Sequence, residues 1–210
     1  GPGVRPGKKE APSAASNRLS EDTRTGLYET VVRDIRPLDL TLRAPATAKM
    51  DDKTKPLGAL GRLEPLGIRM SLIQNRLDPV IRNKAVLVFA ADHGITEEGV
   101  SAYPAEVTGQ MVENFLNGGA AINVLCRHHD IDMKVVDMGV KTSFNLRPGL
   151  TDTLVNKKIA RGTNNFALEP AMTGEQALSA LEAGMSVFLD AHSAAPVDIV
   201  GLGEMGIGNT

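Results

Sequence analysis

The segment that most limits the fold is residues 85–90, which read AVLVFA with no polar interruption. A strand that is covered on both faces has such a run, whereas a half-exposed strand alternates apolar and polar residues. The run ends just before Asp92, His93 and Gly94, which are typical of a chain leaving a strand. We therefore predict a parallel β-strand inside an α/β fold.

Further strands and helices follow this segment in alternation. Apolar runs predict strands at 133–138 and 197–200, and helical spacing predicts helices at 104–116 and 120–128. A third helix is expected after Thr173, because Gln176 three residues later completes a capping box. The alternation predicts an α/β, doubly wound, mainly parallel sheet of the Rossmann-like type, with three strands and an incomplete edge.

The chain divides by composition into three parts. Residues 1–20 are rich in Gly, Pro, Ser, Ala and Lys, which predicts a mobile tail. Residues 21–82 form an N-terminal helical segment, with helices expected at 21–35 and about 60–73. Residues 83–210 form the α/β core, which we expect to be truncated.

Composition excludes several classes of partner. Hydrophobic residues make up 42% of the chain and charged residues 23%, as in compact globular proteins. A net charge of -2 and 3% aromatic residues argue against nucleic acid as a partner. No apolar run approaches the roughly 20 residues of a membrane-spanning helix. The single cysteine, Cys126, lies in a helical pattern and is expected to be a packing residue. We therefore predict a cytoplasmic enzyme that contacts neither nucleic acid nor membrane.

A glycine-rich segment, GLGEMGIGNT at 201–210, directly follows the third predicted strand. Loops at the carboxyl ends of strands are where open α/β sheets bind ligands, and glycines let the backbone approach a phosphate. Glu204 in this segment can face ribose hydroxyls or a developing positive charge, or it can accept backbone hydrogen bonds and fix the loop.

The spacing of Gly201, Gly203 and Gly206 also matches G-x-G-x-x-G, so an NAD-dependent oxidoreductase is an alternative. The dinucleotide fingerprint needs an acidic residue about 20 positions later, beyond Thr210. A non-catalytic binding module is a further alternative.

Five segments together resemble the nicotinate-nucleotide:dimethylbenzimidazole phosphoribosyltransferases. They occur in the order of that family and extend over nearly everything after the predicted tail. The segments are KPLGALGRLE at 55–64, ADHG at 91–94 followed by EGV at 98–100, GGAA at 118–121, ARGT at 160–163 and GEMGIGNT at 203–210.

The resemblance implies transfer of the phosphoribosyl group of nicotinate mononucleotide to 5,6-dimethylbenzimidazole, with inversion at the ribose C1. It implies no metal or cofactor, a homodimer, and a catalytic role for Glu204 beside the nucleotide. It also places the general base of the family beyond the segments found here, so this chain alone is expected to be inactive. The residues that the resemblance places along the nucleotide and the acceptor base are Tyr103, Met111, Met205, Gly206, Ile207, Asn209 and Thr210.

Three polar residues outside the glycine segment have ambiguous roles. Asp92 and His93 are expected to form a structural hydrogen-bonding pair at the end of a strand. Arg161 can steer an anionic substrate or tie down a loop, and it is not counted among the catalytic residues.

Overall fold

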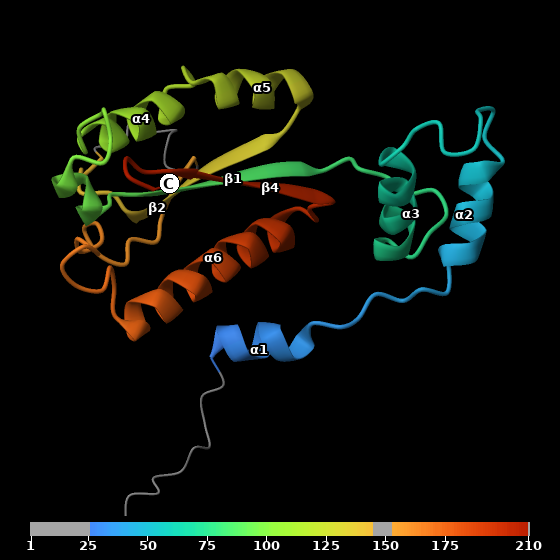
Figure 1. Ribbon diagram of the computed structural model, residues 1–210, viewed down its shortest axis with the longest axis horizontal. Helices are drawn as coiled ribbons and strands as arrows, with labels where there is room; N and C mark the ends of the chain where they lie inside the picture. Colours follow the sequence, from blue (N-terminus) through green and yellow to red (C-terminus); the bar gives the residue numbers. More distant parts are fainter. Residues whose placement is uncertain (1–25, 145–152, 210) are drawn as a thin grey trace, which may run out of the picture.

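The computed structural model describes residues 26–144 and 153–209, so the predicted tail at 1–20 lies outside the described residues. The described chain forms an α/β fold around one sheet of four parallel strands in the order β3-β2-β1-β4 (Figure 1). The strands are β1 (Lys84–Ala91), β2 (Asp132–Gly139), β3 (Leu154–Asn156) and β4 (Ile199–Met205).

Helices cover both faces of this sheet, as the unbroken apolar run of β1 predicted. α4 (Val107–Leu116) and α5 (Ala121–His129) lie on one face and α6 (Gly174–Ala194) lies on the other (Figure 1). Val88 and Ala90 of β1 pack with α4, whereas Leu87 packs with Val187 of α6. Alternate side chains of β1 therefore supply two separate cores.

The capping box before α6 is confirmed. The backbone N–H of Gln176 donates to Oγ1 of Thr173 at 3.1 Å, and the backbone N–H of Thr173 donates to Oε1 of Gln176 at 2.9 Å. These two bonds satisfy N–H groups that a helix start otherwise leaves free.

The N-terminal helices lie in two places. α1 (Leu27–Asp34) lies beside α6, where the backbone N–H of Tyr28 donates to Oε1 of Glu182 at 3.1 Å. α2 (Arg43–Asp51) packs on α3 (Leu63–Ile73) near the end of the sheet where the strands begin (Figure 1). The division into 21–82 and 83–210 stays a prediction.

Three features of the fold differ from the sequence prediction. β3 was not predicted, because its three residues include a single buried apolar side chain, Leu154. α2 was not predicted either. Ala46 is its only buried residue, so its sequence shows no helical spacing of apolar residues. The third predicted strand, placed at 197–200, is β4 and begins and ends later, so the sheet has four strands among the described residues.

The prediction that the chain enters a glycine-rich loop directly after residue 200 is wrong, because Gly201, Gly203 and Glu204 lie within β4 and pair with β1. A Cβ at Gly201 would lie 3.1 Å from Cγ2 of Val86, and one at Gly203 would lie 3.4 Å from Cγ2 of Val88. These glycines let β4 lie against the branched side chains of β1, and the chain turns only from Gly206 onward.

Candidate functional site

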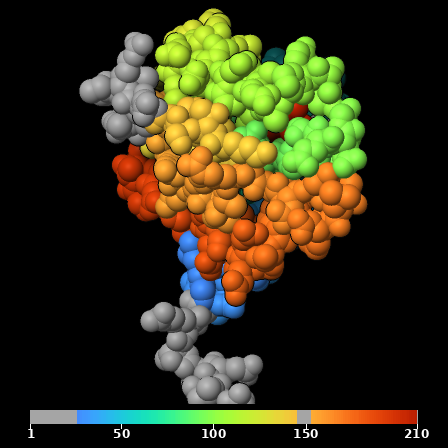
Figure 2. Space-filling model, turned by 90° about the vertical axis from the view of Figure 1, so that its left-hand side faces the viewer, coloured from blue at the N-terminus to red at the C-terminus, as the bar shows by residue number. Residues whose placement is uncertain are grey.

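The candidate site lies where the order of strands reverses. From β1 the chain passes through α4 and α5 to β2 and β3, and it then returns through α6 to place β4 on the opposite side of β1. The loop after β1 and the turn after β4 thus leave the sheet side by side, at the position where open α/β sheets bind ligands. Figure 2 looks onto this edge, where dark-red atoms of the C-terminal segment are visible between green atoms.

The turn formed by residues 206–209 is packed against the loop after β1. A Cβ at Gly206 would lie 2.3 Å from the carbonyl oxygen of Ala91 and 2.7 Å from Nε2 of His93. Gly208 has a φ of 87°, and a Cβ there would lie 3.1 Å from the side chains of both Ile95 and Thr96 in the short helix η1 (Gly94–Glu98). Gly206 is therefore required by the close backbone carbonyl of Ala91, and Gly208 is favoured by its positive φ and the two nearby side chains.

Thr108 of α4 stabilises the same turn from the other side through a hydrogen bond. Its side chain is 0% exposed, and its Oγ1 accepts a hydrogen bond from the backbone N–H of Ile207 at 3.0 Å. Sequence reasoning missed this residue, because a threonine inside an apolar helical pattern gives no signal of its long-range partner.

The predicted acceptor-base residues lie on the α4 face of the sheet. Met111 of α4 and Met205 of β4 both pack against the core that includes Val112 and Ala90. Tyr103 lies in the loop before α4 and is 65% exposed. The structure thus brings Met111 and Met205 to one core, and it leaves the ring of Tyr103 at the surface.

Glu204 lies on the opposite face of β4 from Met205. It pairs in register with Phe89, which packs with the α6 core, and its side chain is exposed. Its carboxylate has no hydrogen bond or ion pair with the residues that the structure describes. Among the described residues, no hydrogen bond supports the alternative in which Glu204 fixes the loop.

The last two predicted site residues are Asn209 and Thr210. Asn209 is exposed, and its backbone N–H donates to the carbonyl of Gly206 at 3.1 Å, which closes the turn. Thr210 lies outside the described residues.

Asp92 has a structural role, but its partner is not His93. Its Oδ2 accepts a hydrogen bond from the backbone N–H of Lys141 at 2.6 Å, which joins the loops after β1 and β2. The guanidinium of Arg161 donates to the carbonyl of Lys141 at 3.0 Å, so Arg161 ties down the same loop. Cys126 is buried as predicted, and burial raises the pKa of its thiol.

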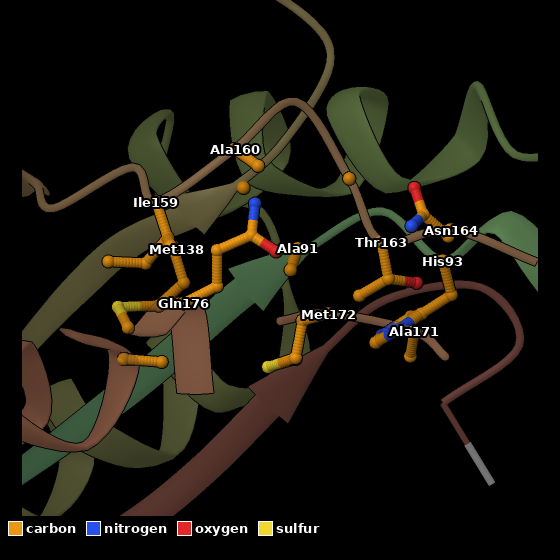
Figure 3. Close-up of a pocket in the computed structure, with 13 residues that line it drawn as sticks. Ala91, His93, Met138, Ile159, Ala160, Thr163, Asn164, Ala171, Met172 and Gln176 are labelled. Atoms are coloured by element: carbon orange, nitrogen blue, oxygen red, sulfur yellow. The ribbon is translucent and has the colours of Figure 1, made fainter. Parts of the chain in front are cut away.

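A cavity of about 160 Å³ lies on the α6 face, at the carboxyl ends of β1 and β2 (Figure 3). Sequence reasoning missed it, because its walls come from five separate stretches of chain. Segment 160–163, which carried part of the family resemblance, forms part of one wall. Its lining includes Ala91, His93, Met138, Met172, Gln176 and Ala180.

The described residues contain no group of three or more His, Cys, Asp or Glu side chains that could hold a metal ion. No helix in the described ranges is both long and apolar enough to span a membrane.

Comparison with known proteins matches the chain to one family. A family model described as "Phosphoribosyltransferase" matches residues 35–210. The nicotinate-nucleotide--dimethylbenzimidazole phosphoribosyltransferase of Cupriavidus taiwanensis is 56% identical over 177 residues, which are 84% of this chain and 50% of the relative. The chain belongs to this phosphoribosyltransferase family. The enzyme of the same name from Geobacter metallireducens is 54% identical over 186 residues, 89% of this chain and 51% of the relative.

Solved structures of the family share the fold. The crystal structure of CobT from Thermus thermophilus has a TM-score of 0.74 and 45% identity, and the match covers 80% of this chain and 49% of that one. A second crystal structure from the same organism, of a nicotinate-nucleotide-dimethylbenzimidazole phosphoribosyltransferase, has a TM-score of 0.76 and 44% identity, over 82% of this chain and 51% of that one. The chain spans about half the length of these phosphoribosyltransferases.

Removing the hydroxyl of Thr108 is expected to loosen the turn 206–209. Thr108→Val keeps the shape but leaves the backbone N–H of Ile207 without its acceptor, which costs about 1–2 kcal/mol of unfolding free energy. Thr108→Ser keeps the oxygen and serves as the control. Urea denaturation followed by far-UV circular dichroism measures both, and equal losses in the two variants would contradict the role of the hydrogen bond.

Proposed function

We propose that the protein acts in the transfer of the phosphoribosyl group from nicotinate mononucleotide to 5,6-dimethylbenzimidazole, which yields α-ribazole 5'-phosphate and nicotinate. The proposal rests chiefly on the turn 206–209, which is packed against Ala91, His93 and η1. Thr108 accepts a hydrogen bond from the backbone of this turn. A glycine turn of fixed shape at a strand end can present backbone N–H groups to a phosphate.

Glu204 supports the proposal because its carboxylate lies two residues before that turn and has no partner among the described residues. Loss of the nitrogen leaving group gives the ribose an oxocarbenium-like character, and a nearby carboxylate stabilises the positive charge. Met111 and Met205 offer thioether and apolar surface on the other face of the sheet, which suits a flat acceptor base.

The oxidoreductase alternative loses its structural basis. Its fingerprint needs the first two glycines in the turn between a strand and a helix, whereas Gly201 and Gly203 lie inside β4. Titration with NADH is expected to give no tight binding, and tight binding would favour the alternative again.

Binding of nicotinate mononucleotide tests the proposed function. By isothermal titration calorimetry the chain is expected to bind the mononucleotide, and Glu204→Gln is expected to bind about tenfold more weakly because one charge-assisted contact is lost. Glu113→Gln makes the same change on the exposed surface of α4 and serves as the control. Equal binding by the Glu204 and Glu113 variants would contradict the role of Glu204.

Turnover is a separate question, because the acceptor must lose a proton to a general base. We propose that a general base of the protein accepts this proton. A chromatographic assay for α-ribazole 5'-phosphate measures turnover, and product that forms only when both substrates are present would support the proposed reaction. We also propose a homodimer in the cytoplasm, which sedimentation and cell fractionation can test.

A further inference from the structure

A buried threonine joins α4 to the turn 206–209. Thr108 is 0% exposed and lies four residues before Val112, which is also fully buried. Burying a hydroxyl costs free energy unless it is hydrogen-bonded, and Oγ1 of Thr108 accepts from the backbone N–H of Ile207 at 3.0 Å. The two residues are 99 positions apart in the chain. The position of the turn therefore depends directly on the position of α4.

The first turn of α4 is also packed against a second loop at this end of the sheet. A Cβ at Gly109 would lie 2.4 Å from Oγ1 and 3.1 Å from Cβ of Thr142, in the loop after β2. The backbone of α4 is thus in close contact with this loop, while the neighbouring Thr108 holds Ile207. The helix, the loop after β2 and the turn are therefore packed as one unit.

The same helix carries a residue that we assign to the acceptor base. Met111 lies three residues after Thr108, and residues at this spacing are neighbours on one face of a helix. Met111 packs against the core to which Met205 also contributes, and Met205 lies two residues before Ile207. An acceptor base held against Met111 thus rests on the helix that holds the nucleotide turn.

We propose that Thr108 is a positioning residue that couples the binding of the two substrates. This inference rests on the proposed function. Nicotinate mononucleotide at the turn 206–209 restrains α4 through Thr108, so that the acceptor base at Met111 meets a helix that is already ordered. The second ligand then loses less conformational entropy on binding, and the two bind cooperatively. Because coupling is reciprocal, each substrate strengthens the binding of the other by the same factor.

The expected size of the coupling follows from the bond that transmits it. A hydrogen bond of typical net free energy changes an equilibrium constant by about fivefold, so each substrate is expected to tighten the binding of the other by about that factor. The hydroxyl of Thr108 is buried, so Thr108 acts on the substrates only through Ile207.

An acceptor that cannot react makes the coupling measurable by isothermal titration calorimetry. In 5,6-dimethylindole a C–H group replaces the nitrogen of 5,6-dimethylbenzimidazole that attacks C1 of the ribose, so no new bond forms. We expect 5,6-dimethylindole to bind about fivefold more tightly when nicotinate mononucleotide is saturating. The mononucleotide should bind more tightly by the same factor when 5,6-dimethylindole is saturating. Affinities that do not depend on the other ligand overturn the proposal.

Three variants separate coupling from a general loosening of the fold, which would weaken each ligand alone but leave the coupling factor unchanged. Thr108→Val removes the acceptor of the Ile207 N–H and is expected to reduce the factor to about one, whereas Thr108→Ser keeps the oxygen and the factor. Thr47→Val is the matched control, because the Thr47 hydroxyl donates to the carbonyl of Arg43 within α2 at 2.9 Å. A Thr108→Val protein that keeps the wild-type factor, or a Thr108→Ser or Thr47→Val protein that loses it, overturns the proposal.

The amide NMR signal of Ile207 tests the coupling without any substitution. We expect 5,6-dimethylindole alone to shift this signal, because the base contacts α4 and Thr108 connects α4 to the Ile207 N–H. An Ile207 signal that stays in place at saturating 5,6-dimethylindole overturns the proposal.

The failure of this inference can be told apart from failure of the proposed function. If nicotinate mononucleotide binds with the same affinity with and without 5,6-dimethylindole, the coupling is refuted and the proposed function stands. If the mononucleotide does not bind at all, the proposed function falls and the coupling falls with it.

Discussion

Gly94→Ala is expected to lower the unfolding free energy by about 3 kcal/mol, at the upper end of the usual cost of overpacking. Gly94 is buried at the start of η1, and a Cβ there would lie 2.5 Å from both the carbonyl carbon of Asn164 and the nitrogen of Asn165. These are backbone atoms, so no side chain can rotate to make room. Either η1 or the backbone at residues 164–165 must therefore move away.

Gly174→Ala provides the control for this substitution. Gly174 is the first residue of α6, and a Cβ there would have no atom within 4 Å, so alanine should leave stability unchanged or raise it slightly. Urea denaturation followed by circular dichroism measures both variants. A Gly94→Ala protein as stable as Gly174→Ala would show that η1 and segment 163–165 are not in close contact.

The same substitution has a consequence for the cavity, because Thr163 and Asn164 form part of its wall. If alanine pushes this segment from η1, the wall shifts relative to His93, and the cavity should change shape as stability falls. Methionine methyl NMR spectra of Gly94→Ala under native conditions can detect this change, since a displaced wall moves the Met172 signal.

The central strand and the longest helix could be predicted because each is specified by residues close together in sequence. β1 has an apolar run that requires cover on both faces, and α6 begins with a complete capping box at Thr173. β3 gave no such signal, because three residues are too few to show a period, and its place beside β2 depends on residues far along the chain.

The candidate site could be predicted only in part, for a related reason. The glycines and Glu204 marked the end of β4, but the pattern did not show that Gly201 and Gly203 serve strand pairing with β1 while Gly206 serves the turn. That difference depends on contacts with Val86, Val88 and Ala91. The cavity was beyond sequence reasoning, since its lining residues carry little signal until the fold brings them together.

Asp137→Ala is expected to lower the unfolding free energy by about 3–4 kcal/mol, because it leaves a partly buried cation and two backbone donors without their acceptor. Asp137 is 3% exposed. Its Oδ1 accepts from the backbone N–H groups of Gly139 at 3.1 Å and Val140 at 2.8 Å, and its Oδ2 pairs with Nζ of Lys158 at 3.0 Å.

Asp137→Asn separates the two contributions. Asparagine keeps an oxygen for the backbone donors and loses only the charge opposite Lys158, so its cost should be about half that of alanine. The loop that Asp137 holds continues to Thr142, whose Oγ1 would lie 2.4 Å from a Cβ at Gly109 of α4. Loss of the carboxylate should therefore also disturb α4 and, through Thr108, the turn at Ile207. If Asp137→Ala lowers stability by less than about 1 kcal/mol in urea, or leaves the amide NMR signal of Ile207 in place, this connection from β2 to the turn does not exist.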